Sequence, residues 1–385
     1  MSRLVLNPSV LLSPLAEGYV AYNTDTNCLH ELNPTAALLV ELCDGTRTAA
    51  EVITLAAPLL PPDSEAAVCA WLEQAIEQTL LIERPVDQQN EVRELSADDL
   101  IELASRLRDE GKVQAAFLCQ QRAAELEPGS ASFQRDLGEL AHIVGRRDDA
   151  RMAYERYLTL QPDDAEIRHL LTSLHDTTTP ARVPDGCIQQ LYRRFSGFYE
   201  SNMCDELSYE GPEHLTAVIE DAIGERRELS ILDLGCGTGL AGDRLKDRAA
   251  HLVGIDLSAE MIELAARREI YDRLEVAEVT QWLDQATGSF DLVVACDTFI
   301  YFGDLNQVIG PASRLLNPGG VIAFSVESAA EPPYRLTDSG RYVHHREHIE
   351  NVARSFGLQV TCREAFLRME YGNEVTALYP TMTPL

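Results

Sequence analysis

The sequence predicts a multidomain protein with a small N-terminal α+β domain, a central pair of helical repeats and a C-terminal α/β domain. Three observations support this prediction. The middle of the 385-residue chain repeats itself with a fixed period. A glycine-rich turn follows an apolar run that ends at Asp233. From Arg227 onward strand-like and helix-like segments alternate, which is typical of a parallel sheet with helices on both faces.

Residues 1–88 combine short strands with short helices. Strands are expected at 18–23 and 27–32, and helices at 33–42, 48–53 and 65–79. Asn33 is placed to cap the first helix, which has Pro34 at its first position. Thr48 and Glu51 have the spacing of a capping box. The pattern predicts a small winged-helix-like domain.

Four short motifs give this domain a family resemblance. They are Leu32-Asn-Pro-Thr-Ala36, Leu42-Cys-Asp-Gly45, Thr48-Ala-Ala-Glu-Val52 and Leu80-Leu81. Over roughly residues 15–85 they resemble the PqqD family, whose small domains recognise ribosomally made, post-translationally modified peptides. The resemblance implies that the leader segment of a precursor peptide adds as a strand to the exposed edge of the sheet.

Two other interpretations of this domain stay open. One is a small helical domain without a partner, and the other is a winged helix that binds DNA. Residues 1–90 contain 12 acidic residues, 3 arginines and no lysine. This charge disfavours DNA, because a nucleic-acid-binding domain needs a basic surface.

Residues 96–175 carry the internal repeat. Leu103, Gly111, Ala116 and Pro128 recur 34 positions later as Leu137, Gly145, Ala150 and Pro162. This period, with glycine at the helix turn and proline after the second helix, resembles the tetratricopeptide repeat (TPR). Such α-helical TPR hairpins predict either a peptide-binding groove or a structural spacer. A threonine- and proline-containing linker is expected at 176–190, followed by one domain at 191–385.

The last domain has the segment order of a doubly wound sheet. Strands are expected at 231–234, 252–255, 274–277, 290–295 and 321–326, and helices at 240–248, 259–268, 306–316 and 346–356. Two further strand-like segments, 358–368 and 373–379, are joined by Tyr371-Gly372. They predict an antiparallel hairpin. The fold expected is therefore a Rossmann-like α/β sheet that ends in an antiparallel hairpin.

A cofactor is indicated by the turn after the first of these strands. Gly235, Gly237 and Gly239 alternate directly after Asp233, so a ligand can lie against bare main chain. Asp256 ends the next apolar run, which begins at Leu252. A carboxylate there is placed to accept hydrogen bonds from ribose hydroxyls. The cofactor expected contains a nucleoside.

Several separate motifs give this domain a resemblance to a known family. They are Asp233-Leu-Gly-Cys-Gly-Thr-Gly239, Gly254-Ile-Asp-Leu-Ser258, Phe290-Asp-Leu-Val-Val-Ala-Cys-Asp297 and Leu316-Asn-Pro-Gly-Gly320. In this order they resemble the class I S-adenosylmethionine (SAM)-dependent methyltransferases, and specifically a subgroup that carries tetratricopeptide repeats. An NAD-dependent dehydrogenase is the alternative. The GxGxG spacing and the antiparallel ending disfavour it.

The resemblance implies a cofactor role for particular residues. The glycines of the turn would line the methionine and ribose, and Asp256 would bind the ribose hydroxyls. Glu278 would lie near the adenine, and Asp297 would lie near the sulfonium. Phe195 and Tyr199 would belong to a segment that closes over the cofactor. The full expected set is Asp233, Gly235, Gly237, Gly239, Asp256, Leu257, Met261, Glu278, Asp297, Phe195 and Tyr199.

Two residues are expected to act on the methyl acceptor. Arg341 and His344 lie in the loop 328–344, which follows a strand of the sheet and so reaches the same edge. An arginine can clamp a carboxylate bidentately, and a histidine can take a proton near neutral pH. The alternative is that both side chains have only a structural role.

Composition sets the cellular context. The formal net charge is −30 and the pI about 4.6, so a nucleic-acid partner is not expected. No apolar stretch is long enough for a membrane span, and the first residues lack a signal-peptide pattern. The nine cysteines form no Cys-x-x-Cys pair, so neither disulfides nor a metal site is expected, and the location expected is cytoplasmic. A homo-oligomer is left open.

The sequence therefore predicts a SAM-dependent methyltransferase that acts on a ribosomally made precursor peptide, with carboxylate O-methylation as one form of the reaction. Two alternatives stay open. One is a methyltransferase for a small metabolite, whose N-terminal domains serve assembly. The other is a non-catalytic, peptide-binding adaptor.

Overall fold

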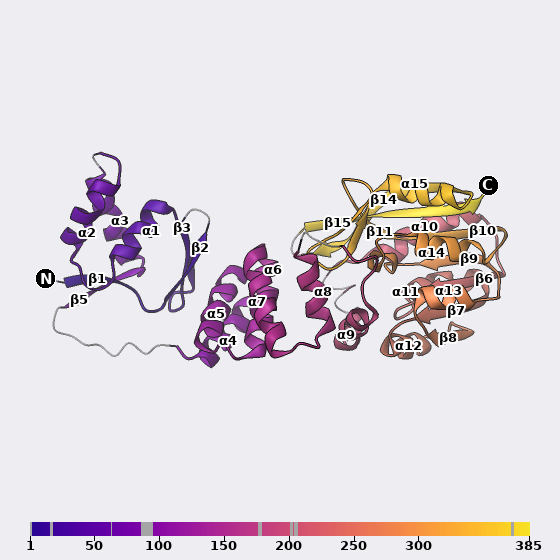
Figure 1. Cartoon of the computed structure of the whole chain (residues 1–385), viewed down its shortest axis with the longest axis horizontal. Coiled ribbons are helices and arrows are strands. Elements are labelled where there is room, and N and C mark those ends of the chain that lie inside the picture. The colour runs from indigo at the N-terminus through magenta and orange to yellow at the C-terminus, as the bar shows by residue number, and fades with distance from the viewer. Residues whose placement is uncertain are drawn as a thin grey trace. The chain divides into compact units, whose positions relative to one another are not determined.

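The computed structural model describes residues 2–15, 18–62, 64–85, 95–175, 179–200, 203, 207–370 and 373–385. The chain forms two compact units, Met1–Gln161 and Pro162–Leu385, and most of their elements are labelled in Figure 1. Within the described residues, no helix has both the length and the apolar character that a membrane span requires.

The first unit begins with two small antiparallel sheets. β1 (Ser2–Leu6) pairs with β5 (Leu81–Pro85). In the second sheet β3 (Gly18–Asn23) lies between β2 (Val10–Leu15) and β4 (Cys28–Leu32), so β2 and β4 form its edges. The sequence pattern indicated β3 and β4 but not β1, which is a short run, nor β2, which contains Pro14.

Three short helices cover the core of this region. They are α1 (Pro34–Leu42), α2 (Ala49–Ala56) and α3 (Glu65–Glu77), with a 3-10 turn at Ala57–Leu59. Asn33 caps α1 by accepting from the Ala36 amide at 2.9 Å, and Thr48 and Glu51 form the capping box of α2. Leu4, Leu39 and Val52 belong to the buried apolar core. A winged-helix classification of this domain stays a prediction.

Two helical hairpins complete the first unit. They consist of α4 (Ala97–Asp109), α5 (Val113–Leu126), α6 (Ala131–Ile143) and α7 (Arg147–Leu160). The bounds of α6 and α7 follow those of α4 and α5 by the same period that the sequence shows. Gly111 and Gly145 occupy equivalent turns with φ of 74° and 76°. The periodicity of the sequence is thus also a periodicity of the helices, and the TPR assignment stays a prediction.

The second unit is built on a mixed sheet. Its parallel part has the order β8 (Arg273–Val276), β7 (Ala249–Asp256), β6 (Leu229–Leu234), β9 (Phe290–Ala295), β10 (Leu316–Phe324). The antiparallel hairpin β14 (Leu358–Glu370) and β15 (Asn373–Pro384) follows, with β15 paired to β10. The expected Rossmann-like sheet with its final hairpin is confirmed. Tyr371 and Gly372 lie outside the described residues.

Short strands that the sequence pattern did not indicate extend the far edge of the sheet. β11 (Val326–Ser328) pairs with β15, β13 (Tyr342–His344) with β11, and β12 (Tyr334–Leu336) with β13. The loop expected at 328–344 is therefore in part a strand pair.

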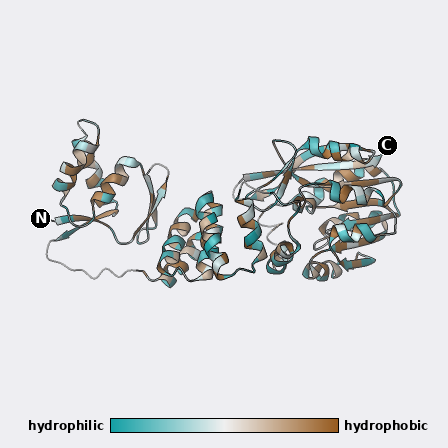
Figure 2. Cartoon of the chain, in the orientation of Figure 1, coloured by the Kyte–Doolittle hydropathy of each residue, from teal (hydrophilic) through white to brown (hydrophobic). Residues whose placement is uncertain are grey.

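Helices cover both faces of the sheet. α13 (Val279–Gln285), α14 (Asn306–Ser313) and α15 (Arg346–Ser355) share one apolar core with it. α10 (Gly211–Ile223) and α11 (Leu240–Leu245), which continues into a 3-10 turn at Lys246–Arg248, share the core of the other face. α12 (Ala259–Ala266) joins β7 to β8. In Figure 2 the strands between these helices are mostly apolar, as expected for a sheet buried on both sides.

Two further helices belong to the second unit although they precede the sheet. The ring Nε2 of His169 on α8 (Ala165–Ser173) lies 2.8 Å from the carbonyl oxygen of Gly340, and the Ser173 hydroxyl donates to the Asp338 carbonyl at 3.2 Å. α9 (Asp185–Phe195) begins inside the segment expected to be a linker. Both helices are thus part of the unit that contains the glycine turn.

The contact between α6 and α7 gives a test of the repeat. A Cβ atom on Gly138 would lie 2.3 Å from the ring of Tyr154, which is fully buried. We expect Gly138→Val to lower the free energy of unfolding by about 1–3 kcal/mol, because the added side chain overpacks this contact. Urea denaturation measures the effect. Gly129→Val is the control, since nothing lies within 4 Å of its Cβ position. Equal stability of the two variants would contradict the packing described.

Candidate active site

A cleft lies at the carboxyl ends of β6, β7 and β9. The neighbours β6 and β9 mark the point where the strand order reverses, which is where open α/β sheets bind ligands. The cleft has an empty volume of about 820 Å³, part of it open to solvent. Its lining residues are Arg182, Ile188, Tyr192, Tyr199, Tyr209, Pro212, Asp233, Gly235, Cys236, Gly237, Thr238, Leu240, Ala241, Asp256, Leu257, Glu278, Val279, Cys296, Asp297, Thr298, Tyr301 and Phe302.

The glycine turn after β6 forms the floor of this cleft. Gly235 and Gly237 have φ of 66° and 54°, in the region that L side chains rarely adopt. A Cβ on Gly235 would lie against the Thr298 side chain, whereas one on Gly237 would meet no atom of the described residues within 4 Å. Gly237 therefore presents bare main chain to the cleft. Gly239, with φ of 90°, begins α11 and is not a lining residue.

Asp256 closes the turn from the end of β7. Its Oδ2 accepts from the Gly237 amide at 2.9 Å and its Oδ1 from the Ser258 amide at 2.8 Å. Burial raises the pKa of Asp256, although these amides act in the opposite direction. Leu257 also lines the cleft, but Met261 is a buried core residue of α12 and does not. The carboxylate thus holds the turn and still faces the cleft.

Asp233 is fully buried at the end of β6. The Tyr271 hydroxyl donates to its Oδ2 at 2.7 Å, and its Oδ1 has no hydrogen-bond partner among the described residues. Burial raises the pKa of Asp233 to about 7, although the Tyr271 hydrogen bond lowers it. An unpartnered buried carboxylate oxygen costs free energy, so this atom is suited to meet a positively charged or hydrogen-bonding ligand.

Glu278 lies where the resemblance implied an adenine contact. It caps α13 by accepting from the amides of Thr280 at 3.0 Å and Gln281 at 2.9 Å. Burial would raise the pKa of Glu278, but the hydrogen bonds from Thr280 and Gln281 lower it. Arg182 lies 3.3 Å from the same carboxylate. Since Glu278 already has these partners, its contact with an adenine stays a prediction.

A segment ahead of the sheet brings Arg182 and a tyrosine to the cleft. The Val183 amide donates to the Tyr301 carbonyl at 2.8 Å, which lays this segment beside the cleft. Further along, Ile188 and Tyr192 lie one turn apart on α9 and both line the cleft. The hydroxyls of Tyr192 and Tyr301 are 2.8 Å apart.

The aromatic residues expected to close over the cofactor divide into two groups. Tyr199 lines the cleft together with Tyr192. Phe195 does not; its ring packs instead against Phe198 at a centroid distance of 5.1 Å, and the Arg194 guanidinium lies over it. Tyr192, rather than Phe195, therefore accompanies Tyr199 at the cleft.

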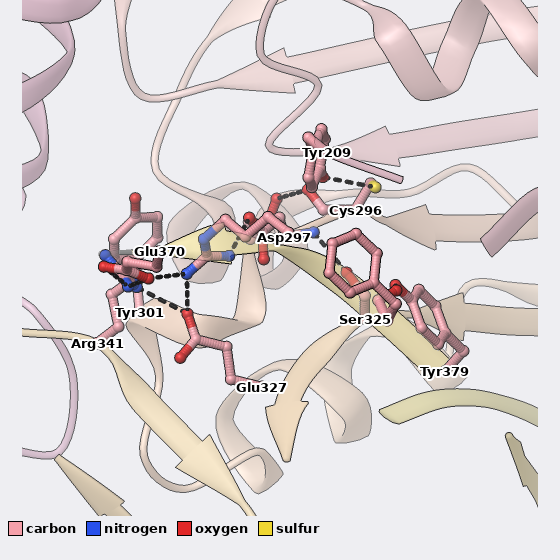
Figure 3. Close-up of polar contacts among 12 residues, drawn as sticks. Tyr209, Cys296, Asp297, Tyr301, Ser325, Glu327, Arg341, Glu370 and Tyr379 are labelled. Atoms are coloured by element: carbon pink, nitrogen blue, oxygen red, sulfur yellow. Dashed lines mark hydrogen bonds and ion pairs between the residues drawn. The ribbon is translucent and has the colours of Figure 1, made fainter. Parts of the chain in front are cut away.

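Asp297 joins the cleft to a buried network of charges (Figure 3). Arg368 on β14 lies 3.5 Å from Asp297 Oδ2 and also pairs with Glu327 and Glu370. Arg341 donates to Glu327 at 2.7 Å and to both oxygens of Glu370. The network thus contains three carboxylates and two guanidiniums. Asp297 Oδ1 has no partner among the described residues.

Arg341 and His344 do not line the cleft. Arg341 is engaged by Glu327 and Glu370, so its guanidinium is already paired. His344 is fully buried, with its ring Nε2 3.0 Å from the Gly303 carbonyl, to which it donates, and burial lowers its pKa to about 4. It is therefore neutral near pH 7. Their assignment as acceptor-binding residues stays an untested prediction, which this geometry does not favour.

Sequence reasoning missed several residues that the fold brings to the cleft or its supporting network, namely Arg182, Tyr192, Tyr209, Tyr271, Cys296, Thr298, Glu327, Arg368 and Glu370. One signal was present for Arg368, which stands between Leu367 and Met369 in an apolar strand. A charged residue in such a place needs a buried partner. Tyr192 begins the segment expected to close over the cofactor, and Cys296 lies inside the motif Phe290–Asp297, but neither was singled out as a site residue.

The described residues fit a nucleoside cofactor that carries a positive charge. Besides the carboxylate oxygens of Asp233 and Asp297, the buried hydroxyl of Thr238 has no partner. Gly237 leaves space beside the main chain, and Asp256 provides acceptors for ribose hydroxyls. Hydrogen-bonding groups that lack partners at one cleft indicate a ligand that supplies them.

Two family models match the chain. Residues 231–320 match the model described as a methyltransferase domain, and residues 18–81 match the model of coenzyme PQQ synthesis protein D (PqqD). The first match contains the glycine turn together with β7, β8 and β9. The second contains β3, β4 and the three helices of the N-terminal region.

Curated relatives agree with the first match. The chain is 30% identical over 177 residues to YqeM of Bacillus subtilis (strain 168), a candidate methyltransferase, and this match covers 43% of this chain and 67% of YqeM. It is 31% identical over 111 residues to a malonyl-[acyl-carrier protein] O-methyltransferase of Pseudescherichia vulneris, covering 29% of this chain and 44% of that protein. The second match thus spans less than half of the relative's own length.

Among solved structures, the chain is similar to the magnesium protoporphyrin IX methyltransferase (ChlM) of Synechocystis PCC 6803 with bound SAM. The identity is 16% and the TM-score 0.39, covering 53% of this chain and 99% of that chain. It is also similar to a SAM-dependent methyltransferase from Clostridium acetobutylicum ATCC 824, at 18% identity and a TM-score of 0.38, covering 51% of this chain and 100% of that chain.

The buried carboxyl of Asp233 predicts a pH-dependent stability. Its pKa is about 7 in the folded protein, against roughly 4 for an unfolded chain. Above pH 7 the folded protein must bury the charge, so Asp233→Asn should raise the free energy of unfolding at pH 8 by roughly 1–3 kcal/mol without ligand. The gain should shrink as pH falls from 7 toward 4, because the folded wild-type carboxyl then binds a proton.

Urea denaturation at several pH values measures this difference. The same variant should bind S-adenosylhomocysteine more weakly, which calorimetry can follow. Asp284→Asn is the matched control, since this carboxylate on α13 is 70% exposed. A stability gain in Asp233→Asn that does not change with pH would contradict the buried charge.

The buried charge network predicts that two arginines of the same strand, β14, contribute differently to the free energy of unfolding. Arg368→Met leaves Glu327 and Glu370 with one guanidinium fewer, so we expect a loss of about 3–5 kcal/mol of stability. Arg363→Met, on the same strand, breaks the exposed pair with Asp221 and should cost less than about 1 kcal/mol. Thermal and urea unfolding measure both. Similar losses of stability in the two variants would show that the buried ion pairs contribute no more to the free energy of unfolding than the exposed pair.

The cleft at the switch point, its glycine turn and the sequence matches over the same strands lead to one assignment. S-adenosylmethionine is the cofactor, and the chain belongs to the SAM-dependent methyltransferases, with a PqqD domain ahead of the methyltransferase domain.

Proposed function

We propose that this protein methylates a ribosomally made peptide whose leader segment is held by the PqqD domain. One observation carries the proposal, namely that a PqqD domain and a SAM-dependent methyltransferase domain occur in the same chain. A peptide-recognition domain gives a methyltransferase a way to select its substrate at a distance from the reacting group. The precursor peptide is therefore the proposed partner.

The sheet of the PqqD domain supports this mode of binding. β4 is an edge strand, and its Cys28, Leu29 and Glu31 are exposed. An edge strand presents unpaired main-chain groups to which an extended peptide can add. The 12 acidic residues and 3 arginines of residues 1–90 favour a leader that is neutral or basic. We propose β4 as the strand that the leader extends.

The helical hairpins fit the role of a spacer. We propose that α4–α7 form TPR-like repeats that separate leader binding from methyl transfer. A leader held on the same chain keeps the rest of the peptide at a raised effective concentration near the cleft. A peptide-binding groove on the repeats is the alternative that the sequence left open.

The methyltransferase cleft supplies what the reaction requires of the protein. The cofactor, when bound, brings a methyl group on a positively charged sulfur. The chain's own task is to hold the cofactor, align the acceptor with the methyl carbon and exclude water. Asp256 and the glycine turn serve the first task. The tyrosines at 192, 199 and 301 enclose the cleft and serve the last.

The cytoplasm is the proposed location. Eight cysteines lie among the described residues and all are free thiols. Free buried thiols are the usual state in a reducing compartment. Peptides made by ribosomes are available there before export.

Methyl-labelled SAM in an extract of the source cell tests the proposal. The full-length protein should label a short peptide, which size separation and mass spectrometry identify. Label found in a small metabolite would instead assign a metabolite methyltransferase. No turnover of SAM with any fraction would favour the adaptor interpretation.

A pair of exposed leucines tests the role of β4. Leu29 on β4 is 48% exposed and Leu55 on α2 is 45% exposed. We expect Leu29→Asp to reduce peptide labelling about tenfold or more, because a charge at the edge opposes an added strand. Leu55→Asp, outside the sheet, should leave labelling within about twofold.

Both variants should bind S-adenosylhomocysteine like the wild type, which shows that the methyltransferase domain is intact. Equal labelling by Leu29→Asp and the wild type would sink the proposal that the leader adds to β4.

A further inference from the structure

We propose that the methyl acceptor is an amine or hydroxyl group that donates a hydrogen bond to Asp297 Oδ1, and that Asp297 takes its proton. A carboxylate is excluded as acceptor. This inference deepens the proposed function, and rests on it only in taking the acceptor to be part of a peptide.

The position of Asp297 is the first argument. It is the second residue after β9, with φ of 54°, and its amide donates to the Ser325 hydroxyl at 2.7 Å. Its side chain is 11% exposed and lines the cleft, while Oδ1 has no partner among the described residues. An aspartate tolerates this left-handed backbone better than most residues. The main chain therefore holds a buried acceptor atom at the cleft wall.

The network behind Asp297 is the second argument. Glu327 and Glu370 share Arg341 and Arg368 through contacts of 3.0 Å or less. Asp297 has a single contact to Arg368, at 3.5 Å. The two positive charges of the guanidiniums thus pair at short distance with the two negative charges of the glutamates. Asp297 is the third carboxylate of the network, and its ion pair is the longest. Arg368 fixes one of its oxygens and leaves the other for a ligand.

This arrangement suits a proton acceptor. Burial raises the pKa of Asp297 and the neighbouring Glu327 adds to this, whereas the Arg368 guanidinium lowers it. The pKa values of Glu327 and Glu370 are lowered by both arginines despite their burial. Within the network, Asp297 is therefore the carboxylate that binds a proton most readily. A general base works best with a pKa closer to the working pH.

The charges along the cleft are the third argument. Among its lining residues are four carboxylates, at 233, 256, 278 and 297, and one guanidinium, that of Arg182. Arg182 is itself paired with Asp185 at 2.6 Å and with Glu278 at 3.3 Å. The guanidinium among the described lining residues is therefore already paired, and the remaining charges that the lining side chains can carry are negative. A carboxylate acceptor would meet like charges, which opposes its binding.

The residues expected to bind the acceptor or to take its proton are engaged elsewhere. Arg341, the expected clamp, is held by Glu327 and Glu370. His344, the expected base, donates to the Gly303 carbonyl and lies outside the lining of the cleft. Asp297, unlike Arg341 and His344, therefore lines the cleft, and it has an unpartnered oxygen there and a fixed position.

The step balances in atoms and electrons. The lone pair of the acceptor nitrogen or oxygen forms the bond to the methyl carbon. The carbon–sulfur bond breaks, and its electron pair stays on the sulfur, which becomes neutral. The proton of the acceptor passes to Asp297 Oδ1 and from there to solvent when the product leaves.

The chemical stability of the product tests the class of acceptor with the wild-type, full-length protein. Product labelled from methyl-labelled SAM in source-cell extract is treated with mild alkali. An N-methyl group or methyl ether keeps its label, which is the expected result, and fragmentation by mass spectrometry then distinguishes nitrogen from oxygen. Release of the label as volatile methanol would identify a methyl ester and overturn the inference.

This readout is independent of the proposed function. Alkali-stable label in a small metabolite would contradict the proposal of a peptide substrate and support the proposal of an amine or hydroxyl acceptor. Alkali-labile label in a peptide would support the peptide substrate and contradict the amine or hydroxyl acceptor.

Asp297→Asn tests the role of the residue. We expect turnover to fall about 10²- to 10⁴-fold, as for loss of a general base, while the dissociation constant for S-adenosylhomocysteine changes less than about threefold. Glu350→Gln, which removes an exposed carboxylate from α15, is the control and should keep full turnover. Unchanged turnover in Asp297→Asn would overturn the inference. An equal loss of S-adenosylhomocysteine binding would make Asp297 a cofactor ligand and overturn it as well.

Discussion

The desolvation of three aspartates at adjacent strand ends is the constraint on which the methyltransferase unit depends. Asp233, Asp256 and Asp297 end or follow β6, β7 and β9, and parallel strands bring their carboxyl ends to one edge. A buried carboxylate is costly unless it is paired or hydrogen-bonded. Each of the three has a different compensation. A tyrosine hydroxyl serves Asp233, two amides serve Asp256, and a guanidinium serves Asp297. None of these saturates its carboxylate, so a cationic cofactor completes the site and stabilises the fold by binding.

The final antiparallel hairpin supplies charged partners for the buried carboxylate of Asp297. β14 carries Arg368 and Glu370 to Asp297, which is 71 residues away from Arg368 in the chain. The same residues reach Arg341 beside β13 and Glu327 on β11. The hairpin therefore does more than extend the sheet, because it supplies the charges that orient a carboxylate at the cleft. A parallel sheet alone would leave Asp297 without its arginine.

Sequence reasoning succeeded where function follows from neighbours along the chain. The glycine turn, Asp233 and Asp256 could be placed because each follows a recognisable strand. The spacing between equivalent helices of the repeats followed from their period. Reasoning from the sequence was less informative for Arg341 and Arg368, because their surroundings depend on pairing between strands that are distant in the chain. A loop position indicated that Arg341 could reach the cleft, but only the sheet reveals the glutamates that engage it. Tyr192 was missed because the helix that carries it, α9, was not expected from the sequence.

Helix α8 has a consequence for how such a chain can evolve. It follows the second helical hairpin, yet its His169 and Ser173 are hydrogen-bonded to the strand-pair loop of the methyltransferase unit. Gene recombination at residue 176 would remove a helix that the enzyme uses, whereas a junction before Pro162 would keep the second unit whole. If α4–α7 act as the spacer proposed above, duplication of whole repeats ahead of that junction would lengthen it in steps of two helices. The reach of the protein toward its substrate could thus change through evolution while the cofactor cleft stayed the same.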